Sequence, residues 1–208
     1  MGGHPIGQLL RAAAGGCFPP PDGDVGVVDP YLPGVEAVVA FTGHAVVATQ
    51  LPAGELERAG ADGFGGATSP RVALLLAGPD GEIDTLDVLL VGHGTGRTGL
   101  GELSVDDEHP RIRHARHWRA DVSVHGDERG LVTVGRGVGG LPELSLEVPP
   151  QRRRSGAGRS LLTDALGLVP AGEPVLAAVA PGNAASLRAV LAAGFAPVGS
   201  VQLIRPAR

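Results

Sequence analysis

The segment that most constrains the fold is an alternating strand that leads through a glycine-rich loop into a helix. Residues 141–148 read LPELSLEV, with Leu144, Leu146 and Val148 on one face and Glu143, Ser145 and Glu147 on the other. Gly156 and Gly158 lie in the polar loop that follows, and a helix is expected from Ser160 to Val169, ended by Pro170. A strand followed by a helix at this point requires both kinds of element in one fold.

The remaining elements are shorter and are separated by many loops, as expected for a chain with 34 Gly and 18 Pro. The hydrophobic pattern predicts strands at 120–125, 131–136, 174–180 and 198–204, two strands within 35–51, a strand or a buried helix at 85–91, and helices at 55–60, 70–77, 183–193 and 106–119. The last of these helices has acidic residues at 106–108 and cations later, the order that a helix dipole favours. We expect an N-terminal region of unknown role at 1–105 and a second domain at 106–208.

Composition excludes several classes of protein. All 17 cationic residues are arginine, and without lysine the chain can have neither a Walker A loop nor a Schiff-base lysine. The net charge of −5 argues against a general nucleic-acid binder, which needs clustered cations. The single Cys17 allows no intrachain disulfide and is interpreted as a small buried apolar residue. The Lys-free, Ala-, Gly- and Arg-rich usage is typical of a GC-rich, bacterial coding sequence.

The sequence predicts a cytoplasmic protein that does not cross a membrane. The first twenty residues lack the sustained apolar core of a signal peptide. The best apolar stretch, residues 35–51, contains Glu36 and His44 and is too short and too polar to span a bilayer.

The glycine loop has the chemistry of a phosphate site. The first amides of a helix lack acceptors and carry partial positive charge, and glycine leaves the backbone open to a ligand. Cations and a hydroxyl stand beside it: Arg152, Arg153, Arg154, Arg159 and Ser160. Taken alone, the segment is equally well interpreted as a glycine-rich turn with solvated arginines.

A second segment decides between these interpretations. Residues 181–195 read PGNAASLRAVLAAGF, with Asn183 as a helix cap, Ser186 in the first turn, and Gly194-Phe195 at the end. Together with residues 153–158 (RRSGAG), which match an R/Q-x-x-G-x-G/A loop, this order resembles the GCN5-related N-acetyltransferase (GNAT) superfamily. The resemblance covers about residues 106–204.

The resemblance implies an α+β fold, with a mixed, mostly antiparallel sheet flanked by helices and preceded by an N-terminal extension. It implies direct transfer of an acyl group from acetyl-CoA, or another acyl-CoA, to the amine of a small molecule or a peptide, without a metal, and leaves a homodimer open. The cofactor would lie between two splayed strands and contact Leu146, Glu147, Val148, Arg153, Arg154, Ser155, Gly156, Ala157, Gly158, Arg159, Ser160, Asn183 and Ser186.

The attacking amine must lose a proton, because an alkyl ammonium has a pKa near ~10. Glu143 and His125 are the candidate bases, and the alternative for Glu143 and Glu147 is an ordinary solvent-facing carboxylate. Many family members place a tyrosine acid where this sequence has Val190, and the only tyrosine here is Tyr31. A degenerate protein that binds acyl-CoA as a sensor or structural ligand therefore remains an alternative.

Other motifs compete with this interpretation. Gly94, Gly96 and Gly99 form a G-x-G-x-x-G, which predicts a nucleotide site only if a helix starts there. The segment 111–119 (RIRHARHWR) is predicted to be a solvated helix that covers the sheet or, alternatively, a patch for nucleic acid or an acidic partner. His109, His114, His117 and His125 have no recognisable metal-ligand spacing, so a metal site is not expected. Leu187, Val190 and Leu191 are predicted to form a buried stripe.

Overall fold

The computed structural model describes residues 3–104 and 109–208, which form two compact units. Unit 1 comprises residues up to Leu89 together with Val198–Arg208, and unit 2 comprises Leu90–Pro197. The unit boundaries therefore fall within two strands, β5 (Asp87–His93) and β11 (Ala196–Arg205). The acidic residues 106–108 and the expected division at 105/106 lie outside the described residues, and that division stays a prediction.

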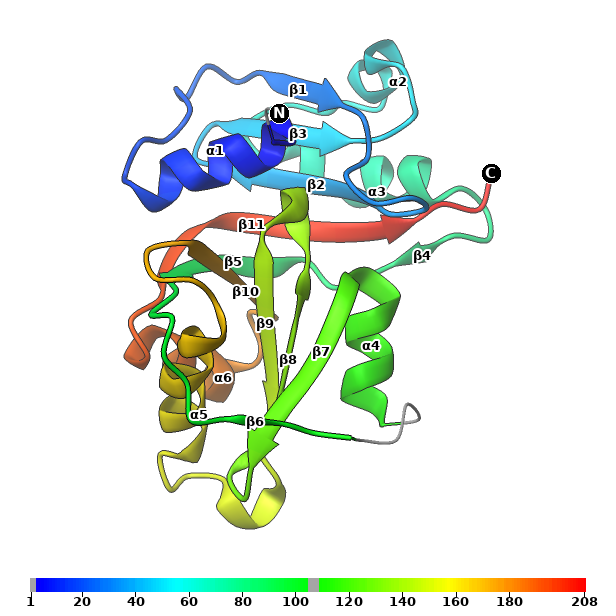
Figure 1. Cartoon of the computed structure of the whole chain (residues 1–208). Coiled ribbons are helices and arrows are strands. Elements are labelled where there is room, and N and C mark those ends of the chain that lie inside the picture. Colours follow the sequence, from blue (N-terminus) through cyan, green and yellow to red (C-terminus); the bar gives the residue numbers. More distant parts are fainter. Residues whose placement is uncertain (1–2, 105–108) are drawn as a thin grey trace. The chain divides into compact units, whose positions relative to one another are not determined.

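Unit 1 is a small mixed sheet with helices (Figure 1). Its further elements are α1 (Pro5–Ala14), β1 (Val25–Val28), β2 (Glu36–Phe41), β3 (His44–Ala48), α2 (Ala53–Arg58), a 3-10 turn at Gly66–Thr68, α3 (Pro70–Ala77) and β4 (Glu82–Ile83). β2 pairs antiparallel with β3 and with β11, and β1 pairs parallel with β3. The N-terminal extension is thus a folded unit that includes the C-terminal strand.

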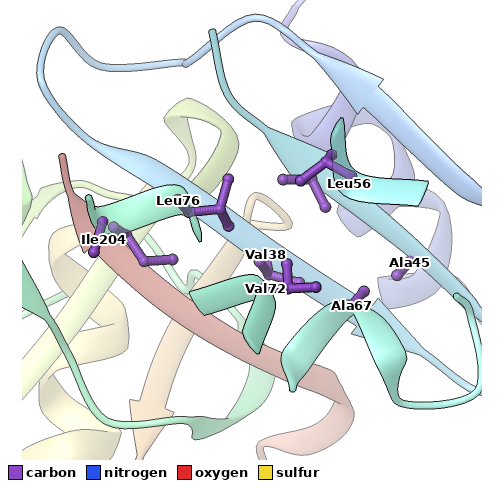
Figure 2. Close-up of a cluster of buried hydrophobic side chains, with 9 residues drawn as sticks. Val38, Ala45, Leu56, Ala67, Val72, Leu76 and Ile204 are labelled. Carbon is purple, nitrogen blue, oxygen red and sulfur yellow. The ribbon is translucent and has the colours of Figure 1, made fainter. Parts of the chain in front are cut away.

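The core of unit 1 is almost entirely aliphatic. Its buried members come from the sheet and from the helices over it: Val38, Ala45, Val47, Leu56, Ala67, Val72, Leu76, Ala77 and Ile204 (Figure 2). β-Branched residues on β2 and β3 suit a pleated surface, and the turn between these strands is tight because Gly43 takes a φ of 70°. Ser69 caps α3 by accepting a hydrogen bond from the Val72 amide.

Unit 2 holds the segments with chemical motifs. Its elements are β6 (Gly101–Glu102), α4 (Pro110–Trp118), β7 (Ala120–Asp127), β8 (Gly130–Arg136), 3-10 turns at Val138–Gly140 and Pro150–Arg152, β9 (Pro142–Glu147), α5 (Ala157–Ala165), a 3-10 turn at Leu166–Leu168, β10 (Pro174–Val179) and α6 (Ala184–Ala192). The strand order is β6-β7-β8-β9-β10, antiparallel except for the parallel pair β9/β10.

α4 and α5 lie on opposite faces of this sheet. Arg119, directly after α4, reaches Ser145, whereas a Cβ at Gly158 of α5 would lie 3.9 Å from Leu146. Ser145 and Leu146 are neighbours on β9, and neighbouring side chains on a strand point to opposite faces. The predicted fold class, a mixed and mostly antiparallel sheet flanked by helices, is confirmed.

Several sequence predictions need correction. α5 begins at Ala157 rather than Ser160. Of the two alternatives left open for residues 85–91, the structure has the strand, at residues 87–93. Cys17 is exposed and not buried. In the predicted stripe of α6, Val190 is buried but Leu191 is 43% exposed. α1 and β1 were not predicted, because α1 is capped by His4 and β1 is short and contains a glycine.

Candidate active site

The two parallel strands β9 and β10 separate almost as soon as they meet. Their only register pair within the described residues is Leu176 opposite Glu143, whereas β8 and β9 pair along six positions. β9 continues to Glu147 and β10 to Val179. The carboxyl half of β9 therefore has β8 on one side and, beyond Glu143, no paired strand on the side of β10.

The glycine-rich loop lies at the end of β9. Arg154 has a φ of 65° and Gly156 a φ of 85°, so the chain turns sharply before α5 begins at Ala157. Ser160 N is the first amide of α5 to bond back, to Gly156 O at 3.1 Å, which leaves the amides of residues 157–159 as the open N-terminal donors. Most of the loop from 151 to 156 is exposed.

The side chains of this loop mostly bond to their own backbone. Arg153 Nε donates to Val148 O at 3.1 Å, Ser155 Oγ to Arg152 O at 2.7 Å, and Ser160 Oγ to Ala157 O at 3.1 Å. Arg153 thereby ties the loop to the end of β9. The exposed guanidinium groups and the open amides make this end of β9 suited to a phosphate group.

α5 is anchored to the β7–β8 turn by a shared arginine. Arg129 Nη2 lies 2.5 Å from Asp127 Oδ2 and 2.7 Å from Asp164 Oδ2 of α5. The hydrogen bond from Arg129 lowers the pKa of Asp127 below its ordinary value, and the two carboxylates raise the pKa of Arg129. The anchor fixes the helix whose N-terminus faces the loop.

The second segment also forms as predicted. Asn183 Oδ1 caps α6 by accepting from Ser186 N at 3.2 Å, and Gly194, with a φ of 94°, follows the helix. α6 packs near α5, since a Cβ at Gly158 would lie 3.8 Å from Ala189 Cβ. Val190, where the family resemblance leads one to expect a tyrosine, is 2% exposed.

Glu143 is a buried, ion-paired carboxylate and does not face solvent. Its Oε1 lies 2.6 Å from Arg119 Nη2, and the two side chains are 3% and 6% exposed. Arg119 Nη1 also donates to Ser145 Oγ at 3.2 Å and approaches Thr133 Oγ1 at 3.5 Å, and these two hydroxyls are 2.7 Å apart. The side of β9 that faces α4 therefore contains a buried polar network.

The structure does not bring the two candidate bases together. His125 of β7 lies opposite Val132 of β8, and Val132 lies opposite Leu146 of β9. The side chains of His125 and Leu146 therefore lie on the same face of the sheet. Glu143 lies on the other face. His125 is also two strands from β9, roughly 10 Å at the usual strand spacing. Its Nε2 is 3.0 Å from Ser123 Oγ, and its buried Nδ1 has no hydrogen-bond partner among the residues that the structure describes.

The glycine motif at Gly94, Gly96 and Gly99 is not directly followed by a helix in the described part of the chain. Strand β5 precedes Gly94, and the backbone of Gly94 and Gly96 bonds to Glu173 and Val169. Among residues 3–104 and 109–208, no cluster of His, Cys, Asp and Glu is arranged to hold a metal. Within the same residues no helix has the length and apolar character for crossing a membrane.

Solved structures similar to this chain include proteins of the family that the sequence resembles. A GNAT-family acetyltransferase from Colwellia psychrerythraea shares 11% identity at a TM-score of 0.41, over 61% of this chain and 57% of that protein. A GNAT-family protein from Novosphingobium aromaticivorans shares 18% at 0.42, over 64% and 70%. A GCN5-related N-acetyltransferase from Kribbella flavida shares 14% at 0.35, over 62% and 61%.

The low sequence identities and TM-scores indicate only a distant structural similarity. The chain spans 57% of the Colwellia protein, less than two thirds of its length. No protein-family model matches the sequence, and no curated protein matches it. The function is therefore inferred from the residues and geometry of unit 2.

Sequence reasoning did not find Arg119, Thr133 or Ser145 as part of the site. Arg119 was grouped with the solvated cations of its helix, although it follows Trp118, the last helical residue, and lies at the start of a strand. Its only local signal is that an arginine adjoins the buried Trp118 and precedes a strand of apolar and small residues. The burial of Glu143 had no signal in the alternating pattern.

Proposed function

We propose that unit 2 binds an acyl-CoA, with acetyl-CoA the expected donor, and transfers its acyl group to an amine. The observation that carries the proposal is the separation of β9 from β10 beyond Glu143, with a glycine-rich helix start at the end of the freed strand. A strand edge without a partner offers backbone donors and acceptors, and the helix start offers a phosphate site.

Each part of the cofactor has matching groups. The backbone of residues 146–148 would hydrogen-bond the amides of the pantetheine arm. The open amides at 157–159 and the guanidinium groups of Arg153, Arg154 and Arg159 would receive the pyrophosphate, with the hydroxyls of Ser155 and Ser160 beside them. Asn183 and Ser186 begin the helix that packs near α5.

The reaction needs positioning more than it needs side-chain chemistry. The amine nitrogen attacks the thioester carbonyl carbon and forms the C–N bond. The C–S bond then breaks, the CoA thiolate leaves, and the excess proton on the nitrogen passes to that thiolate to give the amide and free CoA. A backbone N–H at the strand edge would stabilise the oxyanion. The ammonium proton must leave before attack, and Glu143 and His125 are the candidates proposed from the sequence to take it.

Two matched glycine substitutions test the cofactor site. Gly156 and Gly172 both have positive φ, 85° and 82°, and a Cβ on either would meet nothing within 4 Å. Gly156→Phe and Gly172→Phe thus strain the backbone alike, but only the first puts a ring at the start of α5. We expect Gly156→Phe to weaken acetyl-CoA binding at least tenfold in calorimetric titration and Gly172→Phe to leave it unchanged.

The wild-type protein gives the decisive outcome. Acetyl-CoA binding with transfer to members of an amine panel would support the enzyme, and binding without transfer would favour the sensor. Equal affinities for wild type and Gly156→Phe would exclude the loop as the cofactor site.

A further inference from the structure

Glu143 marks the residue at which the candidate cofactor slot begins. It is the only residue of β9 in register with β10, and beyond it the two strands pair no further within the described residues. The place where β9 is held therefore decides where the slot starts and how far the strand edge is free.

The Glu143 carboxylate is fixed from two directions. Arg119 Nη2 holds Oε1 at 2.6 Å, and Val138 N donates to Oε2 at 3.4 Å from the 3-10 turn before β9. A Cβ at Gly137 would overlap Oε2, so only glycine leaves the carboxylate room there. The side chain is thus enclosed and has no free oxygen facing a reactant.

Arg119 also links β9 to the neighbouring strand β8. Its backbone follows α4, and its guanidinium reaches Glu143 and Ser145 of β9 and approaches Thr133 of β8. Thr133 is fully buried and its hydroxyl contacts that of Ser145. One buried cation therefore joins the end of α4 to β8 and to β9 at the point where β9 leaves β10.

We propose that the buried Arg119–Glu143 pair positions β9 and so sets the start of the acyl-CoA slot, which makes Glu143 a positioning residue and not the base. The inference rests on the proposed function. The Glu143 carboxylate is ion-paired and only 3% exposed, and both of its oxygens already have a donor, so it is poorly placed to accept a proton from a bound ammonium.

Binding of acetyl-CoA gives the first test. Arg119→Met and Glu143→Gln should each weaken binding at least tenfold, and Arg119→Met/Glu143→Met should weaken it no more than the worse single variant, because the members act as one unit. The double variant leaves no buried charge unpaired, so it folds even if a single variant does not. Wild-type affinity in the double variant would overturn the proposal.

The exposed pair Arg136–Asp121 supplies the control. Both residues belong to unit 2, Arg136 Nη2 lies 2.5 Å from Asp121 Oδ2, and the two side chains are 64% and 68% exposed. Arg136→Gln removes one arginine charge, as Arg119→Met does, and should leave acetyl-CoA affinity unchanged.

The pH profile separates positioning from catalysis. If Glu143 only positions the strand, the profiles of kcat/KM against pH for wild type and Glu143→Gln run parallel, and the loss appears mainly in KM for acetyl-CoA. If Glu143 is the base, Glu143→Gln removes the acidic limb and lowers kcat by the 10²–10⁴ typical of a lost base, with acetyl-CoA affinity unchanged. That second result would overturn the proposal.

Amide hydrogen exchange tests the pair without any ligand. Arg119→Met should speed exchange of the amides of residues 143–147 at least tenfold, with β2 of unit 1 as the internal reference. A wild type that binds no acyl-CoA would refute the proposed function, while faster exchange in β9 would still support the role of the pair. Unchanged exchange in β9 would overturn that role.

Discussion

Each unit buries a strand glutamate against an arginine, but the two pairs stand in different surroundings. In unit 1, Glu36 lies on β2, which pairs with β3 on one side and β11 on the other. In unit 2, Glu143 lies on β9, which loses its partner β10 at that residue. The pair Glu36–Arg208 therefore lies on a strand that is paired on both sides, whereas the pair Glu143–Arg119 lies where β9 and β10 stop pairing.

The two glutamates also differ in how many donors they have. Glu36 receives hydrogen bonds from Thr49 Oγ1 at 2.8 Å and Gln50 N at 3.0 Å, besides Arg208 Nη2 at 2.5 Å. Glu143 has Arg119 and one long bond from Val138 N. Glu36 is therefore less dependent on its arginine, which is itself 25% exposed.

The largest effect is expected for Arg119→Met. Removing the guanidinium leaves the buried Glu143 side chain with one weak donor, and breaking a buried ion pair costs about 3–5 kcal/mol. The free energy of unfolding from urea titration measures the loss. Glu143→Met in the same background should restore part of it, since the unpaired charge is then gone, and a double variant as unstable as the single would contradict this account.

A smaller effect is expected for Arg208→Met. Glu36 keeps its bonds to Thr49 and Gln50, so the loss should be about 1–3 kcal/mol, the usual cost of depriving a buried charged group of one donor. Arg208 also donates to Leu76 O, which becomes unpaired. The same urea titration measures this loss in the free energy of unfolding. A loss equal to that of Arg119→Met would show that the bonds from Thr49 and Gln50 do not stabilise the Glu36 carboxylate.

The smallest effect is expected for Asp127→Asn, which loosens the anchor of α5. The pair is partly exposed, so water screens it and the loss at neutral pH should stay below about 1 kcal/mol. Because Arg129 lowers the pKa of Asp127 in the folded state, this stabilisation is present above the ordinary pKa and is lost as pH falls through the lowered one. Unfolding free energies of wild type and variant should therefore converge as the pH falls below the ordinary aspartate pKa of about 3.9 and through the lowered one. A difference that persists in acid would exclude this ion pair as the cause.

Local sequence signals predicted much of unit 2. The alternation at 141–148, the cap Asn183 and the glycine after α6 each act within a few residues, and the structure has the strand, the cap and the turn at those positions. Boundaries were less accurate, since α5 starts at Ala157, directly after Gly156 in a left-handed conformation, and not at the predicted Ser160. In unit 1 the hairpin of β2 and β3 was predicted for the same local reason.

The sequence by itself determined the elements with short-range patterns and the resemblance that they carry. Only the tertiary structure decided that the last strand joins unit 1, that Glu143 is buried rather than solvated, and that Arg119 holds it. These facts depend on contacts between residues far apart in the chain, such as Ile204 with β2 and Arg119 with Glu143. An alternating strand shows which residues share a face, but what covers that face is fixed only when the other elements pack on it.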